Sequence, residues 1–250
     1  MKHIYNHIKD KPDSRDIKYK IPSPHLVSLP TYVDLSHEIV ILDQKTEGSC
    51  VSQGCSQVDR VIRIRKGLPN WIGSRNFIYF NGRSLENDVK DDGGLQVRDG
   101  LKAILWKGVC DENLWPYNST TLFKKPTMPV YKAAIIHKNV QYQSVNQDLT
   151  SIKSALAAKN MIIIGISVYD SFESDSVNAG SPIPLPNTST ETLLGGHCCV
   201  LCGYNDATQM FTLCNSWGES WSNKGFDQIP YNYIANPNLC SDLWILTNAN

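Results

Sequence analysis

The chain has 250 residues, 24 acidic and 24 basic side chains, and eight cysteines. This length can bury a core without disulfides and allows one large domain or two lobes. A net charge of zero gives no basic surface for nucleic acid or for an anionic membrane. An apolar content of 41% with 9% aromatic residues excludes a disordered chain.

No segment predicts export or membrane insertion. The N-terminus lacks the apolar run of a secretory signal. The longest apolar run, around Met161–Ile166, contains a glycine and is far shorter than a membrane helix. We therefore expect an intracellular protein whose cysteines stay reduced.

The first half of the chain predicts helices. Residues 1–30 are polar, contain four prolines and show no hydrophobic period, so they are expected to be extended. A helical period starts at Cys50, and Gly67 is a plausible stop. Two more helices are expected, one capped by Ser74 and one carrying Val97, Leu101, Ile104 and Leu105 on one face.

The second half predicts strands. A short helix near 151–159 precedes a buried strand at Met161–Tyr169, and a loop is expected over 170–194. Strands at His197–Tyr204 and Met210–Asn215 follow, with a last one around 243–247. A helical half followed by a β half predicts an α+β fold of two lobes with a cleft between them.

Cys50 is the candidate nucleophile. A thiol at a helix N-terminus lies at the positive end of the helix dipole, which favours the reactive thiolate. Gly48 and Ser49 are small and allow a tight turn before the helix, so that the Cys50 side chain can project from the helix start. The Cys50 backbone N–H and the side-chain amide of Gln44 are candidate donors to an oxyanion.

His197 and Asn215 are the candidate base and its orienting group. His197 follows two glycines at the start of a strand, and Asn215 ends the next strand. If the two strands pair as an antiparallel hairpin, both residues fall at the same end of it. Cys, His and Asn in this order match a nucleophile, a base and an orienter.

These residues give the chain a resemblance to papain-family (C1-type) cysteine peptidases, and to their bacterial and viral branch. The matching stretches are Asp43-Gln44, Gly48-Ser49-Cys50, Gly195-Gly196-His197 and Asn215-Ser216-Trp217-Gly218, with Leu114-Trp115-Pro116-Tyr117 among several weaker ones.

The resemblance implies a papain-like domain over residues 31–250, with a helical lobe at about 43–117 and a β-rich lobe at about 118–250. It implies a monomeric cysteine endopeptidase that hydrolyses polypeptides through a thioester and needs no metal or other cofactor. In similar enzymes, the positions of Gly93 and Gly94 bind the substrate backbone, Trp217 shields the Asn215–His197 hydrogen bond, and Cys198 lies in the pocket wall.

Three positions depart from the family pattern. Val51 replaces the usual tryptophan after the nucleophile, and Cys198 replaces the usual alanine after the histidine. Glu47 stands where secreted members carry a structural cysteine, so that disulfide cannot form.

Other interpretations of these residues stay open. Cys55 is a rival nucleophile, although it lies on the apolar stripe of the helix. The Cys199–Cys202 pair has metal-like spacing, but residues three apart on a strand point to opposite faces. The acidic loop that contains Glu86, Asp88, Asp91 and Asp92 suggests a calcium site. It lacks the alternating Asp-x-Asp-x-Asp-Gly order of an EF-hand, so a solvated loop is the other interpretation. The same scaffold could serve acyl transfer, isopeptide hydrolysis or binding alone.

Residues 1–30 have two interpretations of nearly equal weight. They form either a short pro-segment over the cleft, which would make the chain a zymogen, or a strap on the back of one lobe.

Overall fold

The computed structural model describes residues 3–23, 28–138 and 140–248. Parts of the 1–30 segment (residues 1–2 and 24–27) therefore lie outside the described residues. The helices are α2 (Cys50–Arg65), α3 (Arg75–Glu86), α4 (Val97–Lys107), α5 (Met128–Ile135), α6 (Leu149–Ala157), α7 (Asp175–Asn178) and α8 (Tyr231–Ala235), with short 3-10 turns η1 (Ser36–Glu38) and η2 (Asp170–Glu173). The strands are β1 (His7–Ile8), β2 (Tyr32–Asp34), β3 (Leu95–Gln96), β4 (Val140–Ser144), β5 (Ile162–Tyr169), β6 (Leu193–Asn205), β7 (Met210–Cys214), β8 (Phe226–Pro230) and β9 (Cys240–Asn248).

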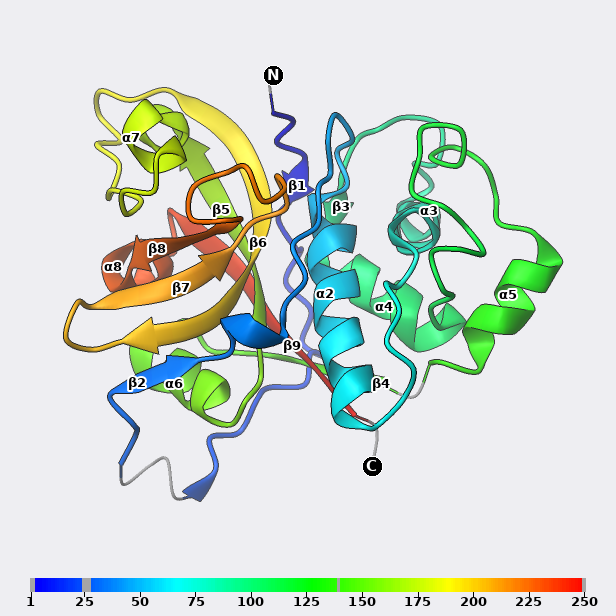
Figure 1. Cartoon of the computed structure of the whole chain (residues 1–250), viewed down its shortest axis with the longest axis horizontal. Coiled ribbons are helices and arrows are strands. Elements are labelled where there is room, and N and C mark those ends of the chain that lie inside the picture. The colour runs from blue at the N-terminus through cyan, green and yellow to red at the C-terminus, as the bar shows by residue number, and fades with distance from the viewer. Residues whose placement is uncertain (1–2, 24–27, 139, 249–250) are drawn as a thin grey trace.

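An antiparallel sheet packs beside a group of helices. The sheet runs in the order β4-β9-β5-β6-β7-β8, and β2 pairs with β6 off this path. Helices α3, α4 and α5 lie on the other side of α2 from strands β6, β7 and β8 (Figure 1). The predicted α+β fold with a helical part and an antiparallel β part is confirmed.

Helix α2 joins the two parts because it is buried on nearly every side. Its apolar residues Val51, Cys55 and Val58 pack in a core shared with one face of the sheet. Gly54 lets the helix approach β6 closely, since an added Cβ would lie 3.4 Å from Val200 Cγ2. The helix that carries the predicted nucleophile is therefore held against the strand that carries His197.

The two cores follow the alternation of side chains along β5 and β6. Cys198, Val200 and Cys202 face the helices, whereas Cys199 and Leu201 belong to the core on the opposite face. Cys199 and Cys202 thus lie in different cores, as the strand period predicts. All eight cysteines are buried and free.

Several boundaries differ from those predicted. The loop expected over 170–194 contains η2 and α7, because Ser174 caps α7 by accepting a hydrogen bond from Val177 N. The last strand is longer than expected and begins at Cys240. Ser74 does cap α3, by accepting a hydrogen bond from Phe77 N at 3.1 Å.

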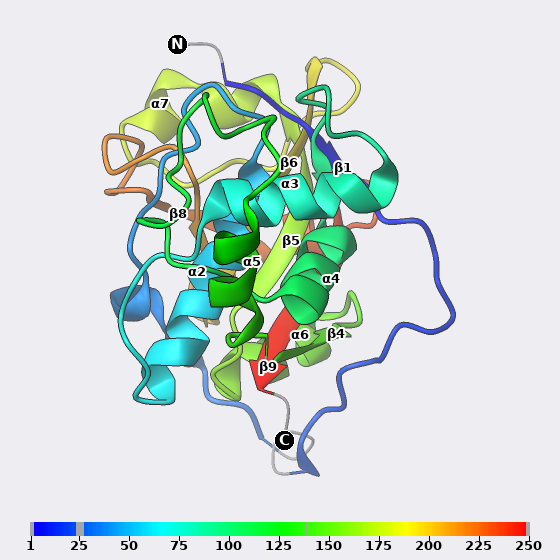
Figure 2. The same cartoon turned by 90° about the vertical axis from the view of Figure 1, so that its right-hand side faces the viewer.

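The N-terminal part of the chain lies partly across the molecule and partly along its outside. β1 pairs in parallel with β3 and lies between β6 and α2 (Figure 1). After β1 the chain runs along the outside of the molecule (Figure 2). There Tyr19 N donates to Ser144 O at 2.8 Å. We call residues 3–8 the covering segment.

A buried ion pair on helix α2 is a position where a substitution should strongly destabilise the fold. Arg63 Nε donates to Asp59 Oδ2 at 2.8 Å, and both side chains are at most 5% exposed. Asp59→Ala is expected to lower the free energy of unfolding by about 3–5 kcal/mol, because it leaves the Arg63 charge buried without its partner. Urea denaturation measures this loss.

A matched control lies at the end of the same helix. Arg65 pairs with Glu38 at 2.6 Å, but these side chains are 30% and 24% exposed. Glu38→Ala should cost less than about 1 kcal/mol. Equal losses in the two variants would contradict the argument from burial.

Candidate active site

Cys50 is the first residue of α2 and is fully buried. Gly48 N donates to Asp92 Oδ2 at 2.8 Å, which fixes the loop before the thiol. Burial raises the pKa of Cys50 to about 11, although backbone N–H groups of Cys198 and Val51 act to lower it. In this state of the chain the thiol is neutral. The backbone N–H groups at the helix N-terminus favour the thiolate, but in this buried state they do not outweigh the effect of burial on the Cys50 pKa.

His197 and Asn215 meet as the hairpin geometry predicts. β6 and β7 pair antiparallel, and His197 Nε2 lies 2.7 Å from Asn215 Oδ1. Ser216 N donates to the same oxygen at 2.8 Å, which fixes the orientation of the Asn215 amide. Because that oxygen accepts, the His197 proton lies on Nε2 and the lone pair on Nδ1.

His197 Nδ1 is buried, and no hydrogen-bond partner is found for it among the described residues. Burial lowers the pKa of His197 to about 4, against the opposing effect of the Asn215 hydrogen bond. The imidazole is therefore neutral above that pH. A free lone pair on a buried, neutral ring can accept a proton from a nearby nucleophile.

Gln44 is joined to the same group of residues. Ser216 Oγ donates to Gln44 Oε1 at 2.7 Å, so the amide nitrogen is left to donate elsewhere. Gln44 Nε2 donates to Glu47 O at 3.0 Å and to Ile4 O at 3.4 Å. Ser216 thus links Gln44 to Asn215, and through Asn215 to His197.

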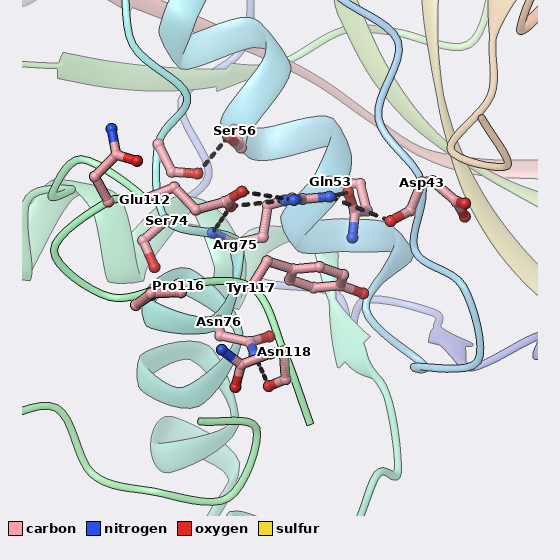
Figure 3. A network of polar contacts seen from close by, with 12 residues as sticks. Asp43, Gln53, Ser56, Ser74, Arg75, Asn76, Glu112, Pro116, Tyr117 and Asn118 are labelled. Atoms are coloured by element: carbon pink, nitrogen blue, oxygen red, sulfur yellow. Dashed lines mark hydrogen bonds and ion pairs between the residues drawn. The ribbon is translucent and has the colours of Figure 1, made fainter. Parts of the chain in front are cut away.

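A polar network that the sequence analysis missed supports the loop that carries Gln44 (Figure 3). Arg75 on α3 pairs with Glu112 at 2.6 Å and donates to Asp43 O at 3.2 Å. Its guanidinium carbon lies 3.8 Å from the ring centroid of Tyr117, whose hydroxyl donates to Gln44 O at 2.8 Å. Only Tyr117 carried a sequence signal, in the Trp-Pro-Tyr stretch, whereas Arg75 and Glu112 stood in no motif.

Of the four predicted substrate-binding residues, Gly94 and Trp217 contact the covering segment. Leu95 N donates to Asn6 O at 3.3 Å, and a Cβ on Gly94 would lie 1.7 Å from that oxygen. The ring of His3 stacks on Trp217 with centroids 3.7 Å apart. The Trp217 ring also lies 5.1 Å from that of His197.

Gly93 and Cys198 are placed differently. Gly93 is exposed beside Asp88. Cys198 is buried in the core that contains Cys50, and burial raises its pKa. Its side chain is thus part of the packing between α2 and β6.

The covering segment reaches the other site residues as well. The ring of Tyr5 meets that of His197 edge to face, with centroids 5.8 Å apart, and its hydroxyl donates to Glu173. Asn6 Nδ2 donates to Asp92 O at 2.6 Å, and Asn6 also bridges to Gly196 of β6. The predicted junction between the two parts of the molecule is therefore occupied by residues of the same chain.

Asp92 of the acidic loop has a structural role. Asp92 accepts from Gly48 N and from the Tyr79 hydroxyl. Over residues 3–23, 28–138 and 140–248, no group of three His, Cys, Asp or Glu side chains could hold a metal ion. In the same part of the chain no helix is long and apolar enough to cross a membrane.

Comparisons with known proteins agree with this geometry. The family model of papain family cysteine proteases matches residues 30–241. The chain is 34% identical to xylellain, a cysteine protease from Xylella fastidiosa, with a TM-score of 0.92 over 98% of this chain and 96% of that one. It is 32% identical to an uncharacterized peptidase C1-like protein of Acanthamoeba polyphaga mimivirus, over 97% of this chain and 86% of the relative.

A more distant structure shares the fold. The Carica candamarcensis cysteine protease CMS1MS2 is 16% identical, with a TM-score of 0.65 over 89% of this chain and all of that one. The match of the family model to most of the chain, together with two relatives above 30% identity, shows that this protein belongs to the papain family of cysteine proteases.

Proposed function

We propose that the chain is a cysteine endopeptidase that cleaves peptide bonds through a thioester intermediate on Cys50. The observation that carries the proposal is the linked series of hydrogen bonds from His197 to Asn215, Ser216 and Gln44. It joins the candidate base to the candidate oxyanion donor, and Cys198, the residue after His197, packs in the same core as Cys50.

The reaction follows from the roles of these groups. His197 Nδ1 takes the Cys50 proton, and the sulfur attacks the scissile carbonyl carbon. Gln44 Nε2 and the Cys50 N–H donate to the oxyanion. The imidazolium then protonates the leaving amine as the C–N bond breaks, which leaves a thioester. Water attacks the thioester, His197 takes its proton, and as the C–S bond breaks the imidazolium returns that proton to the sulfur, so that the acid product and the free thiol are released.

The covering segment supports the further proposal that the chain is made in a latent form. Ile4 O accepts from Gln44 Nε2, the group assigned to the oxyanion. His3 covers Trp217, and Asn6 occupies the edge of β3 that an extended substrate would use. With this segment in place, Cys50 and His197 are both fully buried and neutral. The segment thus acts as an inhibitory pro-segment over residues 3–8, and the chain beyond Ile8 serves as a strap.

Product analysis tests the type of reaction. The protein is incubated with a peptide mixture with and without a competing primary amine, and the products are identified by mass spectrometry. New carboxyl termini in both mixtures support hydrolysis. Products that carry the added amine as their main form would show acyl transfer instead, and an absence of any cleavage would contradict the proposal.

Asn215 gives a separate prediction. Asn215→Ala removes the acceptor that holds the His197 ring 2.7 Å away. The kcat of peptide hydrolysis is expected to fall by about 10²-fold with little change in KM, because the base is misoriented while substrate contacts remain. Steady-state kinetics measures the split between kcat and KM.

Asn187→Ala is the matched control, because its exposed side chain serves only a surface turn. It should leave both constants unchanged. A loss confined to KM in the Asn215→Ala variant would contradict the orienting role.

A further inference from the structure

Helix α5 is largely apolar on every side, but only its inner side is covered by the protein. Val130 and Ala134 are buried and pack in a small core with Phe77 and Cys110. Lys132 is the one charged residue of the helix. Helices that are apolar all round are normally enclosed, in a protein core or in lipid. The outer side of α5 therefore has the composition of a covered surface.

The outer side of α5 exposes large apolar side chains. Met128 is 68% exposed and Ile135 is 42% exposed, and Ile136, which continues the helical backbone as the C-cap, is 73% exposed. Each residue turns the helix by about 100°, so these three and Lys132 fall on the side opposite the buried pair. We call Met128, Lys132, Ile135 and Ile136 the α5 face.

Lysines without an acidic partner flank this face. Lys107 ends α4 next to Gly108, where an added Cβ would lie 1.9 Å from Ala134 O of α5. Lys132 lies on the face itself, and Lys138 follows it in the chain. All three lysines are exposed, and within residues 3–23, 28–138 and 140–248 none of them forms an ion pair.

The sequence around α5 is also basic throughout. Residues 113–147 contain four lysines and no aspartate or glutamate. Glu112, just before this stretch, already pairs with Arg75 at 2.6 Å. The zero net charge of the whole chain therefore conceals a local excess of positive charge, and this excess surrounds exposed apolar side chains.

The combination of charge and apolar surface indicates the kind of partner. A second copy of the chain would meet this face with the same face, because two-fold contacts are self-complementary, and would set lysines against lysines. A nucleic acid or an acidic protein would engage the lysines but leaves isoleucine and methionine without a role. An anionic bilayer satisfies both groups, since apolar side chains enter the acyl boundary while lysines stay at the headgroups.

The position of α5 suits such a contact. In Figure 1, α5 lies at the outer edge of the helical part, with α3 and α4 between it and β1 of the covering segment, and in Figure 2 it faces the viewer. A flat surface can therefore reach α5 without touching the junction that holds His197 and Asn215.

We propose that the α5 face, together with Lys107 and Lys138, docks the protein on the surface of an anionic lipid bilayer. The contact is peripheral: Met128, Ile135 and Ile136 enter the headgroup region, and the lysines bind lipid phosphate and carboxylate groups. Docking of this kind would hold the proposed peptidase near membrane-bound polypeptides. It does not depend on the peptidase activity, and it is tested without it.

Vesicle flotation measures the binding. The full chain is mixed with vesicles of phosphatidylcholine alone or of phosphatidylcholine with about one third phosphatidylserine. At about 0.1 M salt, the apparent affinity for the anionic vesicles should exceed that for neutral vesicles by at least about tenfold. It should fall at about 0.5 M salt, because screening shortens the reach of the lysine charges.

Two double variants separate the charged and the apolar contributions. Lys132→Gln with Lys138→Gln should lower the affinity for anionic vesicles by about tenfold or more, at about fivefold for each lysine. Met128→Ser with Ile136→Ser should lower it by at least about fivefold, because less apolar surface enters the lipid. All four side chains are exposed, so the fold should persist, which circular dichroism can verify.

Each variant has a matched control in the β part of the molecule. Leu185 and Leu193 are 51% and 55% exposed, and Leu185→Ser with Leu193→Ser should leave binding unchanged. Lys159 and Lys224 are exposed, and Lys159→Gln with Lys224→Gln should lower binding less than the lysine variant of the α5 face.

Three results would overturn the inference. The first is an absence of binding to anionic vesicles at low salt. The second is equal binding by the α5-face variants and their controls. The third is a loss in the lysine variant alone, or a dimer in light scattering that Met128→Ser with Ile136→Ser abolishes, because an acidic macromolecule or a second copy of the chain would then be the occupant. None of these results bears on peptide cleavage, so the proposed function stands or falls separately.

Discussion

Deletion of residues 1–8 is expected to raise the rate of peptide hydrolysis by about tenfold or more. The covering segment holds Gln44 Nε2 through Ile4 O and stacks on Trp217 through His3, so a substrate must displace it. Without these residues the same strand edges are free. Turnover of a fluorogenic peptide by the intact and truncated proteins measures the change.

The truncation needs two controls. In the full chain, His3→Ala with Tyr5→Ala removes ring contacts to Trp217 and His197 and should give a smaller rise of the same sign. Arg15→Ala, which disrupts only an exposed pair with Asp13, should have no effect. Unchanged or lower turnover by a folded truncated protein would contradict inhibition and favour a purely structural strap.

The pH dependence of Cys50 alkylation gives a second measure of the effect of deleting residues 1–8. With the pKa of Cys50 raised to about 11 by burial, the thiol of the intact chain stays protonated at neutral pH, and its alkylation should rise only toward that value. Truncation readmits water to Cys50 and His197, which relieves desolvation of both charged forms. The pH at which alkylation becomes fast should therefore shift to lower values, and peptide mapping identifies the labelled cysteine.

Replacement of the nucleophile should have the largest effect of all. Cys50→Ala is expected to lower kcat/KM for peptide hydrolysis by about 10⁴-fold or more, because no other group can form the thioester. Labelling by a thiol-directed epoxide should disappear as well. The fold should persist, which circular dichroism and thermal unfolding can verify.

Cys55→Ala is the matched control on the same helix. Cys55 is buried five residues further along, where burial raises its pKa and its sulfur packs in the core with Val51. This variant should lose some stability but keep both hydrolysis and labelling. If Cys55→Ala abolished hydrolysis and Cys50→Ala did not, the assignment of the nucleophile would be wrong.

Local sequence patterns predicted the frame of the site well. The helix from Cys50, the Ser74 cap and the pairing that brings His197 to Asn215 each depend on residues close in sequence or on one hairpin. Such features follow from helix period, capping chemistry and strand alternation.

The covering segment and the state of the thiol could not be predicted in the same way. His7 pairs with Leu95, and Asn6 bridges to Gly196. These contacts run through the backbone, so they produce no hydrophobic period in the sequence. A helix dipole contributes about 1 kcal/mol or less, whereas full burial shifts a pKa by several units. The sequence shows the helix start at Cys50 but not the chain that covers it, so the effect of burial on the Cys50 pKa could not be predicted from it.

The covering segment belongs to the same chain as β2 (Tyr32–Asp34), which pairs with β6, the strand that Asn6 also bridges. It is therefore a tethered ligand, and a tether of this kind holds a ligand at an effective concentration near the millimolar range. Dilution of the protein cannot release such a ligand, because mass action does not act on an intramolecular equilibrium. A competing substrate or inhibitor must therefore displace the segment against the same effective concentration, whatever the concentration of the protein. Only a cut in the chain between Ile8 and Tyr32 would turn the segment into a ligand that diffuses away.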